Sequence, residues 1–178
     1  MKRWLGAAAL VLAVLASTLV STAAPAQAQG DYFTNAHVYG ASSFLCWDLG
    51  SYADGSPLVI APCHGSSTYY SQQWTAVKPS LGDGWFLRST GSGYGNKCLD
   101  VGSYAPGTYV GLYTCNYSVY MMSQRWWIRI VDGRMRFENV GGGMCMDLGS
   151  NAVGTRVGLY YCHTEGWYTS QQWTYYNT

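Results

Sequence analysis

The stretch CLDVGSYAPGTYVGLYTCNYSVYMMSQRW, from Cys98 to Trp126, is the middle one of three similar blocks in this chain. The other two blocks, of the same length, are CWDLGSYADGSPLVIAPCHGSSTYYSQQW from Cys46 to Trp74 and CMDLGSNAVGTRVGLYYCHTEGWYTSQQW from Cys145 to Trp173. Each block keeps Cys-x-Asp, Gly-Ser, a second Cys 17 positions after the first, and Gln-x-Trp in register. A unit repeated at an interval of about 50 residues indicates three copies, each too small to bury a core alone.

Between these markers the sequence alternates β-prone runs with Gly-rich turns, and helical patterns are almost absent. We expect strands at 58–60, 85–88, 110–113, 126–130, 134–137 and 157–160, with turns at 82–84 and 132–133. Each copy then holds about four strands. Three copies are too few for a propeller, and an open stack would leave exposed edges. We therefore predict an all-β β-trefoil, a closed barrel with pseudo-threefold symmetry, with repeats at about 31–80, 81–130 and 131–178.

The first 28 residues have the pattern of a secretory signal peptide. Lys2 and Arg3 precede an apolar run from Leu5 to about Val20, and Ala26-Gln27-Ala28 is a small-x-small cleavage motif. A retained membrane anchor is the alternative, but no other stretch is long and apolar enough to cross a bilayer. We expect residues 1–28 to be removed and residues 29–178 to form one secreted, extracellular domain.

The charge of the mature chain argues against two classes of partner. The full chain carries +1, and loss of Lys2 and Arg3 leaves −1. Nucleic-acid binding needs clustered Lys and Arg, so we expect no nucleic-acid partner, no attraction to an anionic membrane and no membrane insertion. We expect a monomer.

All six cysteines lie in the predicted mature domain, and an even number in a secreted chain indicates disulfides. Of the 15 possible pairings, the repeat favours those within copies: Cys46–Cys63, Cys98–Cys115 and Cys145–Cys162. Each would close a short loop, worth about 3 kcal/mol in the chain-entropy model. A zinc site is the alternative, but the sequence has no CxxC or CxxH spacing.

Cys-x-Asp, the second Cys and Gln-x-Trp, repeated three times, resemble the ricin B-type lectin family and its bacterial relatives, the family-13 carbohydrate-binding modules. The resemblance covers essentially the whole mature chain. It implies a β-trefoil with up to three shallow sugar pockets, named α, β and γ along the chain. It also implies that the Asp accepts hydrogen bonds from sugar hydroxyls, an aromatic residue stacks on the sugar, a polar residue touches it, and the Gln supports the Asp.

Mapped onto this sequence, the resemblance gives complete sets in copies β and γ. Copy β has Asp100, Tyr113, Asn116 and Gln124. Copy γ has Asp147, Tyr160, His163 and Gln171. Copy α has Asp48, His64 and Gln72, but Ala61 occupies its aromatic position, so we expect α to be the weakest site.

The sequence departs from the family pattern at two positions in every copy. An Asn that often precedes Gln-x-Trp is replaced by Ser71, Ser123 and Ser170. A Gln that often lies four before the second Cys is replaced by Val59, Gly111 and Gly158. The loop before Gln-x-Trp also looks longer than usual and is rich in aromatic residues, which we expect to widen the sugar platform rather than block it.

Simpler roles remain open for each group of residues. Trp74, Trp126 and Trp173 are expected in the core. The three Asp could be turn residues, Tyr113 and Tyr160 could face the interior, and the two His could be ordinary surface residues.

For the whole chain we predict a lectin for neutral glycans of the galactose, xylose or arabinose type. We expect no catalytic residue, because glycoside hydrolysis needs a pair of carboxylates and the repeat supplies only one per copy. We also expect no cofactor and no metal. A small secreted protease inhibitor and a polysaccharide hydrolase are the alternatives.

Overall fold

The computed structural model describes residues 36–65, 68–91, 96–165 and 168–177; the predicted signal peptide lies outside them. The first copy contains β1 (Ala36–Gly40), β2 (Leu45–Leu49), β3 (Leu58–Pro62) and β4 (Trp74–Val77). The second contains β5 (Trp85–Ser89), β6 (Lys97–Val101), β7 (Val110–Thr114) and β8 (Arg125–Val131). The third contains β9 (Arg134–Asn139), β10 (Met144–Leu148), β11 (Val157–Tyr161) and β12 (Trp173–Asn177). These bounds confirm the predicted strands.

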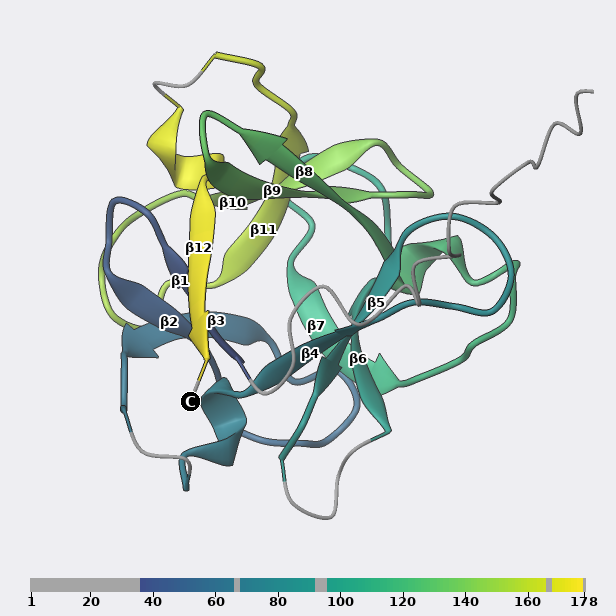
Figure 1. Ribbon diagram of the computed structural model, residues 1–178, viewed down its shortest axis with the longest axis horizontal. Coiled ribbons are helices and arrows are strands. Elements are labelled where there is room, and N and C mark those ends of the chain that lie inside the picture. The colour runs from purple at the N-terminus through teal and green to yellow at the C-terminus, as the bar shows by residue number, and fades with distance from the viewer. Residues whose placement is uncertain (1–35, 66–67, 92–95, 166–167, 178) are drawn as a thin grey trace, which may run out of the picture.

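The first and last strands of each copy close into a barrel. Antiparallel pairings run from β1 to β4, β5, β8, β9 and β12, and β12 returns to β1. The closing pair extends from Ala36 opposite Asn177 to Gly40 opposite Trp173, and the two strands run side by side in Figure 1. Closure leaves no open edge in the barrel, which confirms the predicted β-trefoil.

The middle strands of each copy form hairpins, β2–β3, β6–β7 and β10–β11, that meet around the pseudo-threefold axis. Isolated bridges join each copy to the next: Pro57 to Gly111, Tyr109 to Gly158, and Arg156 to Val59. In this cycle, the residue just before the third strand of each copy lies beside the third strand of a neighbouring copy.

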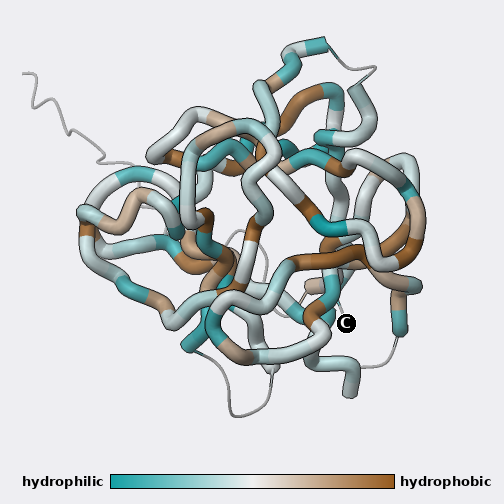
Figure 2. The backbone as a smooth tube through the Cα atoms, turned by 180° about the vertical axis from the view of Figure 1, so that it is seen from behind, coloured by the Kyte–Doolittle hydropathy of each residue, from teal (hydrophilic) through white to brown (hydrophobic). Residues whose placement is uncertain are grey.

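One large hydrophobic core fills the barrel and the hairpin layer, and a small second cluster contains Phe86, Cys98 and Cys115. Trp74, Trp126 and Trp173 are fully buried, as predicted. Trp47 joins them, with its ring 5.2 Å from Trp173 and 5.8 Å from Trp74 in edge-to-face contacts. Figure 2 shows short brown, hydrophobic stretches that alternate with white and teal ones along the backbone.

The three predicted disulfides are present within copies, with Cα–Cα separations of 4.9–5.0 Å. The two predicted turns differ from each other. Asp132 and Gly133 form a tight turn in which both residues have positive φ, as a two-residue hairpin loop requires. Gly82 and Gly84 instead belong to a wider connection, residues 78–84, between β4 and β5. No helix among the described residues is long and apolar enough to span a membrane.

Candidate functional site

The predicted Asp and Tyr of copy β lie on one face of its hairpin. Asp100 on β6 is directly opposite Gly111 on β7, and Tyr113 lies two residues further along β7. Leu112, between them, points into the core and is fully buried, so Tyr113 points outward. Copy γ repeats this register, with Asp147 opposite Gly158 and Tyr160 beyond it.

The two tyrosines are exposed, at 40% for Tyr113 and 47% for Tyr160. The alternative that they face the interior is therefore wrong. At the matching position of copy α, Ala61 offers no ring.

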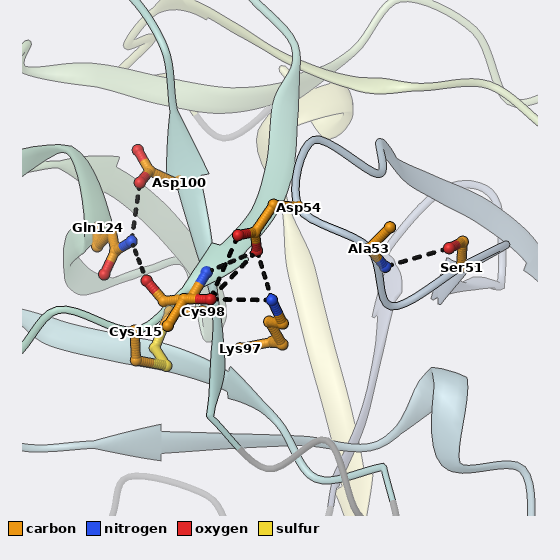
Figure 3. A network of polar contacts seen from close by, with 9 residues as sticks. Ser51, Ala53, Asp54, Lys97, Cys98, Asp100, Cys115 and Gln124 are labelled. Carbon is orange, nitrogen blue, oxygen red and sulfur yellow. Dashed lines mark hydrogen bonds and ion pairs between the residues drawn. A yellow bond between two sulfur atoms is a disulfide. The ribbon is translucent and has the colours of Figure 1, made fainter.

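A buried Gln holds each Asp in place. In copy β, Gln124 Nε2 donates to Asp100 Oδ2 at 2.8 Å and to the Thr114 carbonyl at 3.0 Å. Its Oε1 accepts from the Asn116 backbone N–H at 2.7 Å. Figure 3 shows the Gln124 amide nitrogen pointing toward Asp100. Gln72 and Gln171 make the same three contacts in copies α and γ.

All three Gln side chains are buried and fully engaged within the protein. They therefore position the Asp rather than present a group to a ligand. Each Gln is the last residue of a short 3-10 turn, which directs its side chain back toward the hairpin. The three turns are Tyr70–Gln72, Met122–Gln124 and Thr169–Gln171.

The second carboxylate oxygen distinguishes copy α from the others. Asp48 Oδ1 accepts from the Leu49 backbone N–H at 2.7 Å, and Val59 lies directly opposite Asp48. Among the described residues, nothing donates to Oδ1 of Asp100 or Asp147, and a glycine lies opposite each. Oδ1 of Asp147 and of the largely buried Asp100 is therefore an open acceptor, one with no donor among the described residues, and glycine adds no side chain beside it.

The two open carboxylates line hollows in the surface. A hollow of about 390 Å³ contains Asp100, Tyr113, Tyr104 and Ser123. A second, of about 300 Å³, contains Asp147 and Tyr160 with Gly158, Tyr109 and Arg156. A third, of about 320 Å³, lies between them and is lined by Asp100, Tyr113, Tyr109 and Arg156, among others.

The loop aromatics add stacking surface in two copies. Tyr69 stacks on His64 at 3.8 Å in copy α, and Tyr168 stacks on His163 at 3.5 Å in copy γ. His163 also lies 6.3 Å from Tyr160 in a nearly parallel orientation, so copy γ has three rings in succession.

Copy β has Asn116 instead of a histidine, and the Asn116 carbonyl Oδ1 accepts from the Ser118 backbone N–H at 3.0 Å. Its loop aromatic Tyr117 packs edge-on against Phe86. The loop tyrosine thus stacks on a histidine in copies α and γ but not in copy β, and a widened sugar platform stays a prediction.

A turn of copy α also supports the site of copy β. Asp54 accepts from Lys97 Nζ at 2.5 Å and from the Thr114 backbone N–H at 2.8 Å (Figure 3). The hydrogen bond from Lys97 is the main cause that lowers the pKa of the Asp54 carboxyl below its ordinary value. These contacts hold Thr114, whose carbonyl accepts from Gln124.

The arrangement in copies β and γ combines three elements: a fixed carboxylate with an open oxygen, an exposed tyrosine ring, and polar groups around a shallow hollow. A carboxylate accepts strong hydrogen bonds from hydroxyl groups, and an aromatic ring packs against an apolar C–H face. This combination matches the chemistry of a sugar ring.

Sequence reasoning missed Tyr104, Tyr109 and Arg156, which line the hollows. Tyr109 and Arg156 lie at the repeat position of Pro57. Their bridges to the next copy join residues distant in sequence, so no local pattern indicates these contacts.

The sequence profile described as "Ricin-type beta-trefoil lectin domain" matches residues 34–136, which is more than half of the chain. The chain belongs to this family. A ricin-type lectin domain is a carbohydrate-binding, non-catalytic domain. The match ends within β9, and copy γ is recognised by the repeated spacing of its own residues. A comparison of this chain with curated proteins finds no match.

Solved structures share the fold of this ricin-type domain. The designed threefold-symmetric protein ThreeFoil is 24% identical with a TM-score of 0.67, covering 80% of this chain and 98% of its own. The Macrolepiota procera ricin B-like lectin, solved in complex with lactose, is 23% identical with a TM-score of 0.62, covering 81% and 95%. An exo-beta-1,3-galactanase from Clostridium thermocellum is 22% identical with a TM-score of 0.67, covering 82% of this chain but 30% of the enzyme.

Proposed function

We propose that this ricin-type domain is a secreted lectin that binds neutral glycans through its β and γ pockets. The observation that carries the proposal is the pairing of an open carboxylate oxygen with an exposed tyrosine in these two copies: Asp100 with Tyr113, and Asp147 with Tyr160. Copy α, with Ala61 and a capped Asp48, contributes least.

Galactose-type glycans are the first candidates among the galactose, xylose and arabinose types. The Macrolepiota lectin was solved with lactose, and a Polyporus squamosus lectin of the same fold was solved with a Neu5Ac-Gal-GlcNAc epitope. Because these proteins are less than 25% identical to this chain, their ligands guide the choice of sugars to test.

Binding without catalysis is the second part of the proposal. In the galactanase the matching region is less than a third of the enzyme. The β and γ hollows are each lined by one carboxylate, held by its Gln, rather than the opposed pair that glycoside hydrolysis requires. Extracellular location is supported by the leader-like residues 1–28 and by three disulfides, which persist in oxidising compartments.

A glycan array followed by calorimetry tests the proposal. The mature domain should bind at least one galactose-, xylose- or arabinose-type glycan, and the double variant Asp100→Ala/Asp147→Ala should lose it. Each lost charged acceptor weakens a site by about 1.5–3 kcal/mol, roughly 10- to 150-fold. Asp83→Ala, in an exposed loop, is the control and should bind normally. Array binding that survives the double variant would place the sites elsewhere, and release of reducing sugar from the bound glycan would indicate a hydrolase.

A further inference from the structure

The three hollows are neighbours that share lining residues, and together they are called the groove below. The hollow at Asp100 and Tyr113 shares both residues with the central hollow. The central hollow shares Tyr109 and Arg156 with the hollow at Asp147. Because neighbouring hollows have lining residues in common, a ligand unit in one hollow lies close to the next hollow.

Arg156 lines both the central hollow and the hollow at Asp147, and it makes no ion pair among the described residues. Its guanidinium carbon is 5.2 Å from the centroid of the Tyr109 ring, a cation–π contact. The ion pairs of the described residues are Lys97–Asp54 and Arg129–Glu138, and neither involves Arg156. With one face of the guanidinium on the ring, its N–H edges remain free to bind a planar anion in a bidentate manner.

The fold does not require an arginine at this position. The same repeat position is Pro57 in copy α, Tyr109 in copy β and Arg156 in copy γ, and all three make the same kind of bridge to a neighbouring copy. The arginine–tyrosine pair therefore occurs once, at the junction of the two pockets that have complete site residues.

We propose that Arg156 and Tyr109 form a subsite for an acidic sugar, of the uronic-acid or sialic-acid type. The proposal rests on the lectin function above and extends it. A neutral unit of the glycan occupies the Asp100 or the Asp147 pocket, and a neighbouring carboxylate-bearing unit places its carboxylate on Arg156. The carboxylates of Asp100 and Asp147 repel a negative charge at either end of the groove, so Arg156 also fixes the register of the glycan.

Calorimetry with matched acidic and neutral glycans tests this subsite. The pairs are 6′-sialyllactose with lactose, glucuronic-acid-substituted xylo-oligosaccharides with unsubstituted ones, and glucuronic-acid-bearing arabinogalactan oligosaccharides with their carboxyl-reduced forms. In at least one pair the acidic member should bind about tenfold more tightly, as expected for a charge-assisted hydrogen bond. The Arg156→Gln variant should lose this advantage, so that the acidic and the neutral member of the pair bind with equal affinity.

Arg129→Gln is the control, because Arg129 also lies over an aromatic ring, Trp127, at 4.9 Å, and is exposed. This variant also removes one positive charge, but Arg129 is not among the residues that line the hollows. It should therefore leave the affinity for both members of each pair unchanged. Neutral binding with no acidic preference in any pair, or a preference that survives Arg156→Gln, would overturn the subsite. Failure of the lectin proposal is distinct, because the neutral glycans would then also fail to bind.

Discussion

Copies α and γ have the same scaffold but different ligand-facing residues. Both hold their Asp with a buried Gln that makes three internal hydrogen bonds, and both stack a loop tyrosine on a histidine. They differ outside this frame: Ala61 and Val59 in copy α correspond to Tyr160 and Gly158 in copy γ.

The comparison separates what folding requires from what binding requires. A buried Gln that lost its partners would leave polar groups unsatisfied, at about 1–3 kcal/mol each, so the scaffold tolerates little change. An exposed tyrosine has no such constraint, because the fold is complete without it, as Ala61 shows. The frame alone therefore does not identify a working pocket.

Removal of a disulfide should have the largest effect and should not distinguish the two copies. The Cys46–Cys63 and Cys145–Cys162 disulfides close loops of equal length. The double variants Cys46→Ala/Cys63→Ala and Cys145→Ala/Cys162→Ala should therefore each lower the unfolding free energy by about 3 kcal/mol. Thermal unfolding should show a Tm lowered by about 6–12 °C in both. A large difference between the two variants would mean that the scaffolds are not equivalent.

Exchange of the exposed residues should convert one copy into the other. Tyr160→Ala gives copy γ the plain surface of copy α and should weaken its sugar binding roughly tenfold, since aromatic packing contributes about 0.5–1.5 kcal/mol beyond burial. The reverse change, Val59→Gly/Ala61→Tyr, should create a third site. The calorimetric stoichiometry for a monosaccharide should then rise from two to three. An unchanged stoichiometry would indicate that the hydrogen bond from the Leu49 N–H is sufficient to keep Asp48 closed.

The turn before the third strand should have the smallest effect. Copy α has Asp54 there, paired with Lys97, where copy γ has Val153. Because the Lys97 hydrogen bond lowers the folded-state pKa of Asp54 below its ordinary 3.8, the pair stabilises the fold above that pH and loses its effect as pH falls further. Wild type and Asp54→Asn should differ slightly in Tm at pH 6 and converge near pH 2. A difference that persists at pH 2 would exclude the carboxylate as its source.

The sequence was sufficient to predict the barrel, the within-copy disulfides and the hairpin residues, because each follows from a local pattern repeated three times. Period-two alternation around Leu112 and Leu159 would also have placed Tyr113 and Tyr160 outside the core. The role of Arg156 was not predictable. It depends on the bridge from Tyr109 to Gly158, and on how three hairpins meet around the axis, which no local pattern encodes.

The central claim is that copies β and γ bind sugar while copy α mainly completes the fold. Each pocket alone should be weak, with a Kd from millimolar to tens of micromolar, or about −4 to −6.5 kcal/mol. A polymer that engages both pockets should bind about 10²-fold more tightly.

Calorimetry of a monosaccharide and its polysaccharide against Asp48→Ala, Asp100→Ala and Asp147→Ala tests the claim most directly. Asp100→Ala and Asp147→Ala should each reduce polymer affinity almost to the monosaccharide level, and Asp48→Ala should change it little. An Asp48→Ala variant as impaired as the other two would contradict the account.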